Sequence, residues 1–190
     1  MALSSERGFP QFLALGMMMR GWALALQGQG EEGIAQMHQG LAAFRAAGAE
    51  LGRPYWLILL AEAYGQVGQT EAGLTTLAEG LATAHKTGER YWEAELYRLK
   101  GELLLTLSAE KHTEAETCFH QALDIARQQQ ARSLELRAAM SLARLWQRQG
   151  KRAAACELLA PIYGWFTEGF DTADLQEAKV LLEALSHASR

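Results

Sequence analysis

The sequence is poor in cysteine, proline and aromatic residues. Two cysteines among 190 residues cannot build a disulfide framework, so we expect buried thiols in a reducing cytoplasm. Three prolines and 8% aromatic residues, beside abundant alanine, leucine, glutamine and glutamate, are typical of an all-helical chain. Basic residues show no excess either. The net charge is −4, which disfavours a dedicated nucleic-acid binder.

Long apolar runs are also missing. No stretch approaches the roughly 20 uninterrupted apolar residues that a membrane span needs. Arg7 and the apolar segment 12–19 imitate a secretion signal with a small-residue cleavage site at 23–25. Arg20 interrupts that segment, which also fits the repeat described next. We therefore expect a cytoplasmic protein with no membrane association.

What the sequence does have is a repeat. Four small residues with apolar neighbours stand at steps of 40, 40 and 42: Gly21, Ala61, Gly101 and Ala143. A second small set follows 12 to 14 residues later: Gly33, Gly73, Ala115 and Ala155. Bulky residues come four places further on: Met37, Leu77, Phe119 and Leu159. Paired small residues let two antiparallel helices approach closely, and the bulky residue fills the space beside them. The pattern therefore predicts stacked helix pairs.

Turn signals and helical periodicity divide the chain into nine helices. We expect them at 10–28, 31–47, 54–67, 70–87, 90–107, 112–129, 132–149, 151–167 and 172–187. They form a single domain over 1–190, an all-α solenoid whose four repeats cover about 10–50, 51–89, 90–130 and 131–168. A capping helix at 171–188 follows, with Leu175, Ala178, Leu182 and Leu185 on its apolar face.

The first helix is apolar nearly all round, which is normal for a helix buried on both sides. We expect something to pack there: earlier repeats, another domain, or a second copy of the chain. For self-association the candidate residues are Leu15, Met18 and Trp22.

The small–aromatic–turn pattern resembles the tetratricopeptide repeat (TPR). The third repeat matches it best, with Leu99-Lys100-Gly101 followed by Ala115, Phe119 and Ala122. The pitch is about six residues longer than the usual 34 of that family. The resemblance implies a helix-pair scaffold that binds other proteins.

Two stretches, 88–102 and 164–172, look like the C-terminal repeats of large bacterial regulators. In those proteins a cyclase or DNA-binding module and an NTPase module precede such repeats. The resemblance implies a sensory or scaffolding arm of a signalling protein, without a cyclase or NTPase module of its own.

Candidate chemistry in the sequence is weak. Residues 28–33 match G-x-G-x-x-G, but they lie between two predicted helices, whereas a dinucleotide fingerprint follows a strand. Cys118 and His120 point in nearly opposite directions on a helix and cannot share a metal ion. The acidic residues 93, 95 and 102 fit a salt-bridge ladder with Arg98. We expect neither catalysis, a metal nor a cofactor.

The first helix of each pair is expected to line a partner-binding groove, apolar at one end and basic at the other. The groove-facing residues are Trp22, Tyr55, Ile58, Glu62, Glu95, Arg98, Glu102, Arg137, Arg144 and Arg148. Such a groove suits an acidic peptide with an apolar anchor, because arginine binds carboxylates bidentately. In the alternative interpretation, the arginines are a solvated face paired with Glu135 and Glu157, and Trp22 belongs to the core.

These patterns leave three functions open. The leading one is a protein-interaction scaffold, the regulatory arm of a larger bacterial signalling protein. The second is a self-association module that forms a homodimer through the first helix. The third is a small-ligand sensor or an undetected enzyme. Six basic residues against one acidic residue between 132 and 152 also permit a nucleic-acid stripe, a weaker interpretation.

Overall fold

The computed structural model describes residues 9–186, and every regular element within them is a helix. The α-helices are α2 (Pro10–Leu26), α3 (Gly30–Ala46), α4 (Arg53–Gln66), α5 (Thr70–Thr87), α6 (Glu93–Leu107), α7 (His112–Gln128), α8 (Arg132–Arg148), α9 (Arg152–Tyr163) and α10 (Ala173–Ser186), with a 3₁₀ turn η1 at Ala109–Lys111. The predicted all-α class is confirmed. None of these helices is long and apolar enough to cross a membrane.

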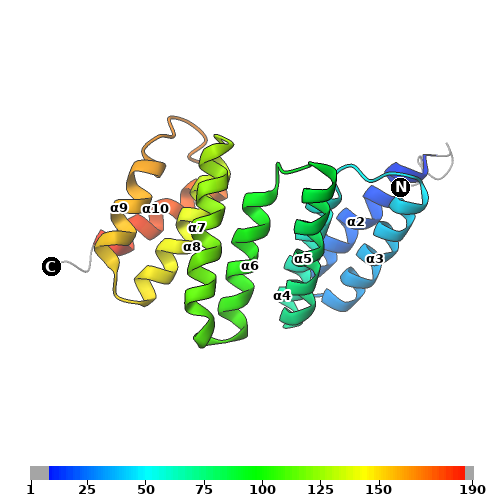
Figure 1. Cartoon of the computed structure of the whole chain (residues 1–190), viewed down its shortest axis with the longest axis horizontal. Helices are drawn as coiled ribbons and strands as arrows, with labels where there is room; N and C mark the ends of the chain where they lie inside the picture. The colour runs from blue at the N-terminus through cyan, green and yellow to red at the C-terminus, as the bar shows by residue number, and fades with distance from the viewer. Residues whose placement is uncertain (1–8, 187–190) are drawn as a thin grey trace. The chain divides into compact units, whose positions relative to one another are not determined.

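The helices form two compact units, an N-terminal unit (residues 1–92) and a C-terminal unit (residues 93–190). In the N-terminal unit α2 packs on α3 and α4 on α5, and α4 also contacts both helices of the preceding pair. In the C-terminal unit α6 pairs with α7 and α8 with α9, while α8 contacts α6 and α7. Successive pairs therefore stack in order within each unit (Figure 1).

Small residues mark the closest helix approaches, as the repeat spacing predicts. A methyl group added at Gly21 would lie 2.6 Å from the carbonyl oxygen of Gly33 and 2.7 Å from Cγ of Met37. At Gly101, in the C-terminal unit, it would collide with the ring of Phe119. The small residue of one helix and the bulky residue of the next thus occupy the same space, which confirms the pairing inferred from sequence.

Two predicted helix boundaries are wrong, and local geometry explains both. Helix α6 begins at Glu93 and not at residue 90, because Gly88 ends α5 with φ 75° and residues 89–92 form the connection. Helix α9 ends at Tyr163 and not at residue 167. Pro161 lies inside it and lacks the N–H that would continue the bonding ladder.

Helix α10 covers the last pair, since it contacts both α8 and α9. Its buried residues are Leu175, Ala178, Leu181 and Leu185. Leu182, which the sequence placed on this face, is only half-buried, and Leu181 takes the core position. The predicted end of this helix, residues 187 and 188, lies outside the described residues.

Candidate partner-binding groove

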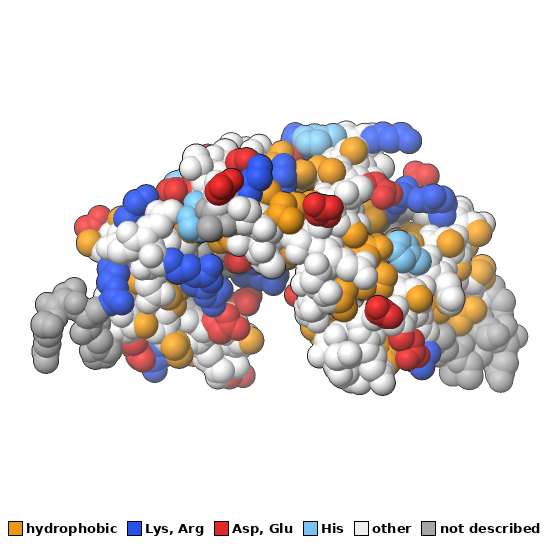
Figure 2. Space-filling model, turned by 90° about the horizontal axis from the view of Figure 1, so that it is seen from below, with side chains coloured by type: hydrophobic (Ala, Val, Ile, Leu, Met, Phe, Trp, Pro, Cys, Tyr) orange, Lys and Arg blue, Asp and Glu red, His pale blue; other side chains and the backbone are white. Residues whose placement is uncertain are grey.

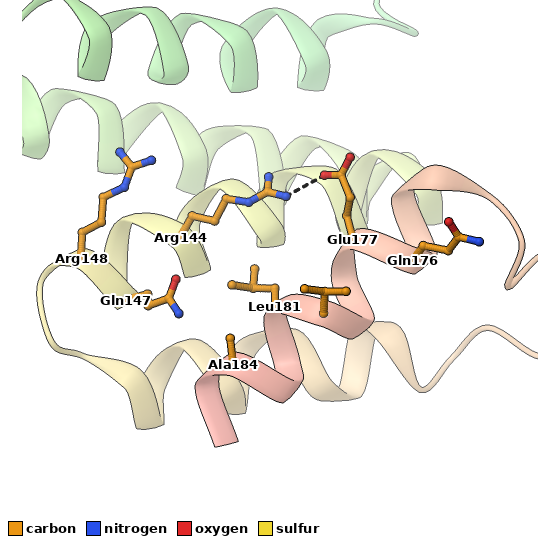
Figure 3. Close-up of a pocket in the computed structure, with 8 residues that line it drawn as sticks. Arg144, Gln147, Arg148, Gln176, Glu177, Leu181 and Ala184 are labelled. Carbon is orange, nitrogen blue, oxygen red and sulfur yellow. Dashed lines mark hydrogen bonds and ion pairs between the residues drawn. The ribbon is translucent and has the colours of Figure 1, made fainter. Parts of the chain in front are cut away.

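A groove runs between α8 and α10 in the C-terminal unit (Figure 3). Arg144 and Arg148 are four residues apart and therefore lie on one face of α8. Glu177 and Leu181 have the same relation on α10, beside Val180 and Ala184. The residues enclose a hollow of about 580 Å³, with Gln147 and Gln176 completing the lining.

The groove combines an apolar floor with basic groups that a ligand can reach. Val180 is 65% exposed, although a valine on a helix surface is normally covered. Arg144 donates a 2.7 Å hydrogen bond to Glu177, and both side chains are open to solvent. Such surface pairs contribute only about 0–1 kcal/mol. Arg148 is exposed and has no ion-pair partner among the described residues. One guanidinium is therefore free, and the other is held weakly.

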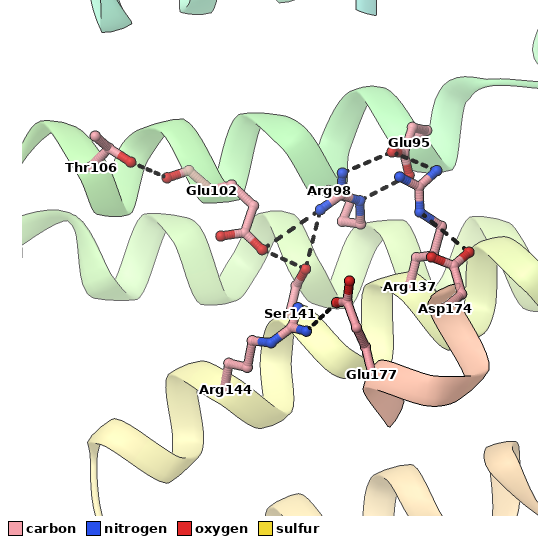
Figure 4. A network of polar contacts seen from close by, with 9 residues as sticks. All are labelled: Glu95, Arg98, Glu102, Thr106, Arg137, Ser141, Arg144, Asp174 and Glu177. Atoms are coloured by element: carbon pink, nitrogen blue, oxygen red, sulfur yellow. Dashed lines mark hydrogen bonds and ion pairs between the residues drawn. The ribbon is translucent and has the colours of Figure 1, made fainter. Parts of the chain in front are cut away.

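A buried carboxylate organises the helix ends next to this groove (Figure 4). Glu95 on α6 is 4% exposed and accepts hydrogen bonds of 2.9 and 2.8 Å from Arg98. Arg137 on α8 forms a further ion pair with it at 3.1 Å. Burial alone would raise the pKa of Glu95, but the attraction of Arg98, its hydrogen bonds and the charge of Arg137 outweigh burial and lower that pKa. The carboxylate therefore stays charged.

The network then extends to neighbouring helices. Ser141 on α8 donates a 2.6 Å hydrogen bond to Glu102 on α6, whose carboxylate also lies 3.6 Å from Arg98. Arg137 reaches Asp174 on α10 at 3.8 Å. Of the six residues that the sequence places in this half of the groove, Glu95 is interior, and Arg98, Glu102 and Arg137 connect helices. Only Arg144 and Arg148 line the hollow.

The apolar half of the predicted set lies in the N-terminal unit. Trp22 is half-buried, and its indole donates a 3.0 Å hydrogen bond to Glu62, forty residues along the chain. The ring of Tyr55 lies 4.8 Å from that of Trp92. Ile58 is buried in the core, so it cannot face a groove. These contacts join α2 to α4 and fix the residues that precede α6.

A second hollow, of about 390 Å³, lies beside Tyr55. Its lining has no charged residue and includes Phe12, Leu51, Trp56 and Trp92. On the face shown in Figure 2, hydrophobic side chains form broad patches on this unit, whereas charged side chains cluster on the C-terminal unit. The two units thus present different chemistry to a partner.

The three predicted self-association residues do not form an exposed patch. Met18 is fully buried, because it fills the space over Gly40, where an added methyl group would lie 2.6 Å from its Cγ. Leu15 and Trp22 are half-buried. The exposed apolar residues of α2 include Phe12 and Met19 instead. A helix that is apolar all round gives no pattern that tells Met18 from Met19.

The weak chemical motifs have structural explanations. Gly28 adopts φ 86° in the turn between α2 and α3, and Gly33 packs against Gly21. Cys118 is buried, and burial raises the pKa of its thiol. Within residues 9–186, no group of three or more histidine, cysteine or acidic side chains is placed to hold a metal ion.

Comparisons with known proteins agree with this architecture. No protein-family model matches the sequence. An uncharacterised protein of Rhizobium meliloti (strain 1021) is 30% identical over 129 residues, which are 68% of this chain but only 12% of that protein. Two crystal structures of nearly identical TPR-like repeats, assigned to a kinesin light chain of Podosopora anserina, superpose with TM-scores of 0.70 and 0.68. They are 20% and 21% identical and cover 94% of this chain and 87% of theirs. The chain therefore has the TPR-like α-solenoid fold.

Proposed function

We propose that the chain is a protein-interaction scaffold, non-catalytic by itself, whose α8–α10 groove binds an acidic peptide segment with an apolar anchor. The observation that carries this proposal is the pairing, in one hollow, of an exposed apolar floor with the guanidinium groups of Arg144 and Arg148. TPR-like solved structures support a scaffold in general terms.

The groove matches such a segment group by group. Arg148 offers a planar fork to a carboxylate, and Arg144 offers a second when Glu177 is displaced. Because the displaced pair is solvent-exposed, exchanging one carboxylate for another costs little. Val180 and Leu181 take the anchor, whose burial contributes about 1.5–3 kcal/mol for one large aliphatic side chain. The amides of Gln147 and Gln176 are placed to bond the peptide backbone.

The same proposal assigns the chain to the regulatory arm of a larger bacterial signalling protein. The supporting observation is that the matched segment makes up only 12% of the Rhizobium meliloti relative. Two stretches of the sequence also resemble the repeats of such regulators. A scaffold arm of this kind transmits the binding of a partner to the module attached to it.

Fluorescence anisotropy with a labelled helical peptide tests the groove. The peptide carries glutamates and leucines three and four residues apart, and a control peptide replaces its glutamates with lysines. We expect Arg144→Glu/Arg148→Glu to weaken binding of the acidic peptide at least tenfold, because each lost charge-assisted bond contributes about 1.5–3 kcal/mol.

Arg45→Glu is the matched control, since Arg45 is an exposed arginine of the N-terminal unit outside the groove. It should bind like the wild type. Equal binding of the acidic and the lysine peptide, or equal loss in both arginine variants, would contradict the proposal. Arg98 is unsuitable for this test because its removal disturbs the Glu95 network.

A further inference from the structure

The outward face of α2 carries a regular apolar stripe. Phe12, Met19 and Leu26 are 63%, 43% and 48% exposed and stand seven residues apart. Gly16 and Ala23 lie between them on the same face. This stripe is opposite the buried face of the helix, formed by Ala14, Met18, Gly21 and Ala25. Helix α2 is thus apolar on two sides, and α3 and α4 cover only one.

The repeat shows what this fold does with such a face. Forty residues later on α4, the positions equivalent to Met19 and Ala23 are Leu59 and Ala63. Both are buried, and they pack in one cluster with Ala25, Ile34 and Met37 of the preceding pair. The face that α2 leaves open is therefore the face that α4 buries against other helices.

The C-terminal end of the same chain does not fit the stripe. The exposed residues of α10 include Gln176, Lys179 and Glu183, which are polar or charged. Covering them with Phe12 and Met19 would remove those groups from water without hydrogen-bond partners. Head-to-tail stacking of copies is thus disfavoured, and an isologous contact, in which both copies use the same face, is the remaining way for the chain to bind itself.

The stripe is complementary to itself. Counted from Met19, Phe12 and Leu26 are seven residues before and after, while Gly16 and Ala23 are three before and four after. We propose that a second copy of the chain covers this face, with the two α2 helices antiparallel about a two-fold axis at Met19. Phe12 then packs against Leu26 of the second copy, and Gly16 lies near Ala23 of the second copy.

The charge and size of the stripe agree with this arrangement. Arg20 is the one charged residue of α2, and it stands at the edge of the stripe, where its long side chain can reach water. Gly16 and Ala23 permit close approach of the helix axes. A contact between two helices of 17 residues, each about 25 Å long, is at the small end of specific interfaces, below about 1,200 Å². The dimer should therefore dissociate in the micromolar range.

Sedimentation of the whole chain between about 1 µM and about 1 mM spans the expected range of affinities. We expect the mass to rise with concentration from 20.9 kDa towards twice that value, and Met19→Glu to keep the chain monomeric throughout. Val180→Glu is the matched control: an acid at another exposed valine should leave the dimer intact but abolish acidic-peptide binding. Met19→Glu should retain peptide binding, so failure of this proposal and failure of the proposed function are distinguishable.

Cysteine cross-linking tests the register, in a Cys156→Ser background where the other native thiol, Cys118, is buried. Met19→Cys should form a disulfide with itself, because residues on a two-fold axis bring their Cα atoms within about 7 Å. Phe12→Cys and Leu26→Cys should each fail alone but cross-link when mixed. A monomer at every concentration, leaving the face to a further helix pair, overturns the proposal. So does a dimer that Met19→Glu does not disrupt, or cross-linking of Phe12→Cys to itself.

Discussion

The two units use the same three repeat positions in different ways. In the N-terminal unit they are Tyr55, Ile58 and Glu62, which stack on Trp92, fill the core and accept a bond from Trp22. Forty residues later they are Glu95, Arg98 and Glu102, which form a buried ion network.

One helix-pair geometry therefore tolerates both apolar and ionic connections between pairs. The difference has a thermodynamic consequence. Apolar burial depends weakly on pH, whereas a buried ion network requires a charged carboxylate and matched partners. The N-terminal unit should thus be fastened by packing under all mild conditions, and the C-terminal unit only while its network is intact.

The largest effect is expected from Glu95→Ala. Removing one partner of a buried ion pair leaves Arg98 and Arg137 without their carboxylate and should destabilise the C-terminal unit by about 3 kcal/mol. Urea unfolding followed by Trp146 fluorescence measures it. Glu177→Ala, which removes an exposed partner of Arg144, is the control and should cost about 0–1 kcal/mol. Similar losses in the two variants would remove the distinction between the units.

A smaller contrast separates Gly21→Ala from Gly101→Ala. At Gly21 the new methyl group meets backbone atoms of α3, so a steric cost of about 3 kcal/mol exceeds the helix-propensity gain of about 1 kcal/mol. At Gly101 it meets the ring of Phe119, a side chain that can turn, and the net loss should be about 1 kcal/mol or less. Thermal unfolding measures both. Adding Phe119→Leu should relieve the second variant, and its failure to do so would contradict this steric account.

These glycines also show what the sequence could predict. Gly21, Gly33 and Met37 were identifiable because the spacing of small and bulky residues is written along the chain. Met18 and Met19 were not distinguishable, since α2 is apolar on both faces and the position of α3 decides between them. The partners of Glu95 come from α6 and α8, so no single segment reveals the network.

Acid should weaken the C-terminal unit through Glu95. Its pKa in the folded chain is below the ordinary 4.5, so the unfolded chain binds its proton first as the pH falls. The stabilisation is fully present above about pH 4.5 and is lost as the pH falls through the lowered value. Urea midpoints of the wild type and Glu95→Gln should therefore converge on acidification. A constant difference between them from neutral pH down to strong acid would contradict this.

The smallest effect concerns the connections between helix pairs. The N-terminal unit has Gly48 and Gly88 there, with φ of 71° and 75°, whereas the C-terminal unit has Gln130 at φ 54°. A side chain in this left-handed region costs about 1 kcal/mol. Gln130→Gly should thus raise the unfolding free energy of the C-terminal unit by roughly 0.5–1 kcal/mol, measured by thermal melting. Gln129→Gly, at φ −80°, is the control and should not stabilise.

The indole contacts described above make this chain its own reporter. Trp22 bonds Glu62 in one unit, and Trp146 donates a 2.7 Å hydrogen bond to Glu116 in the other. Loss of either bond exposes a fluorophore to water and shifts its emission to longer wavelength. Variants that keep a single tryptophan would therefore let the melting of each half, and the arrival of a partner on it, be watched separately without any attached dye.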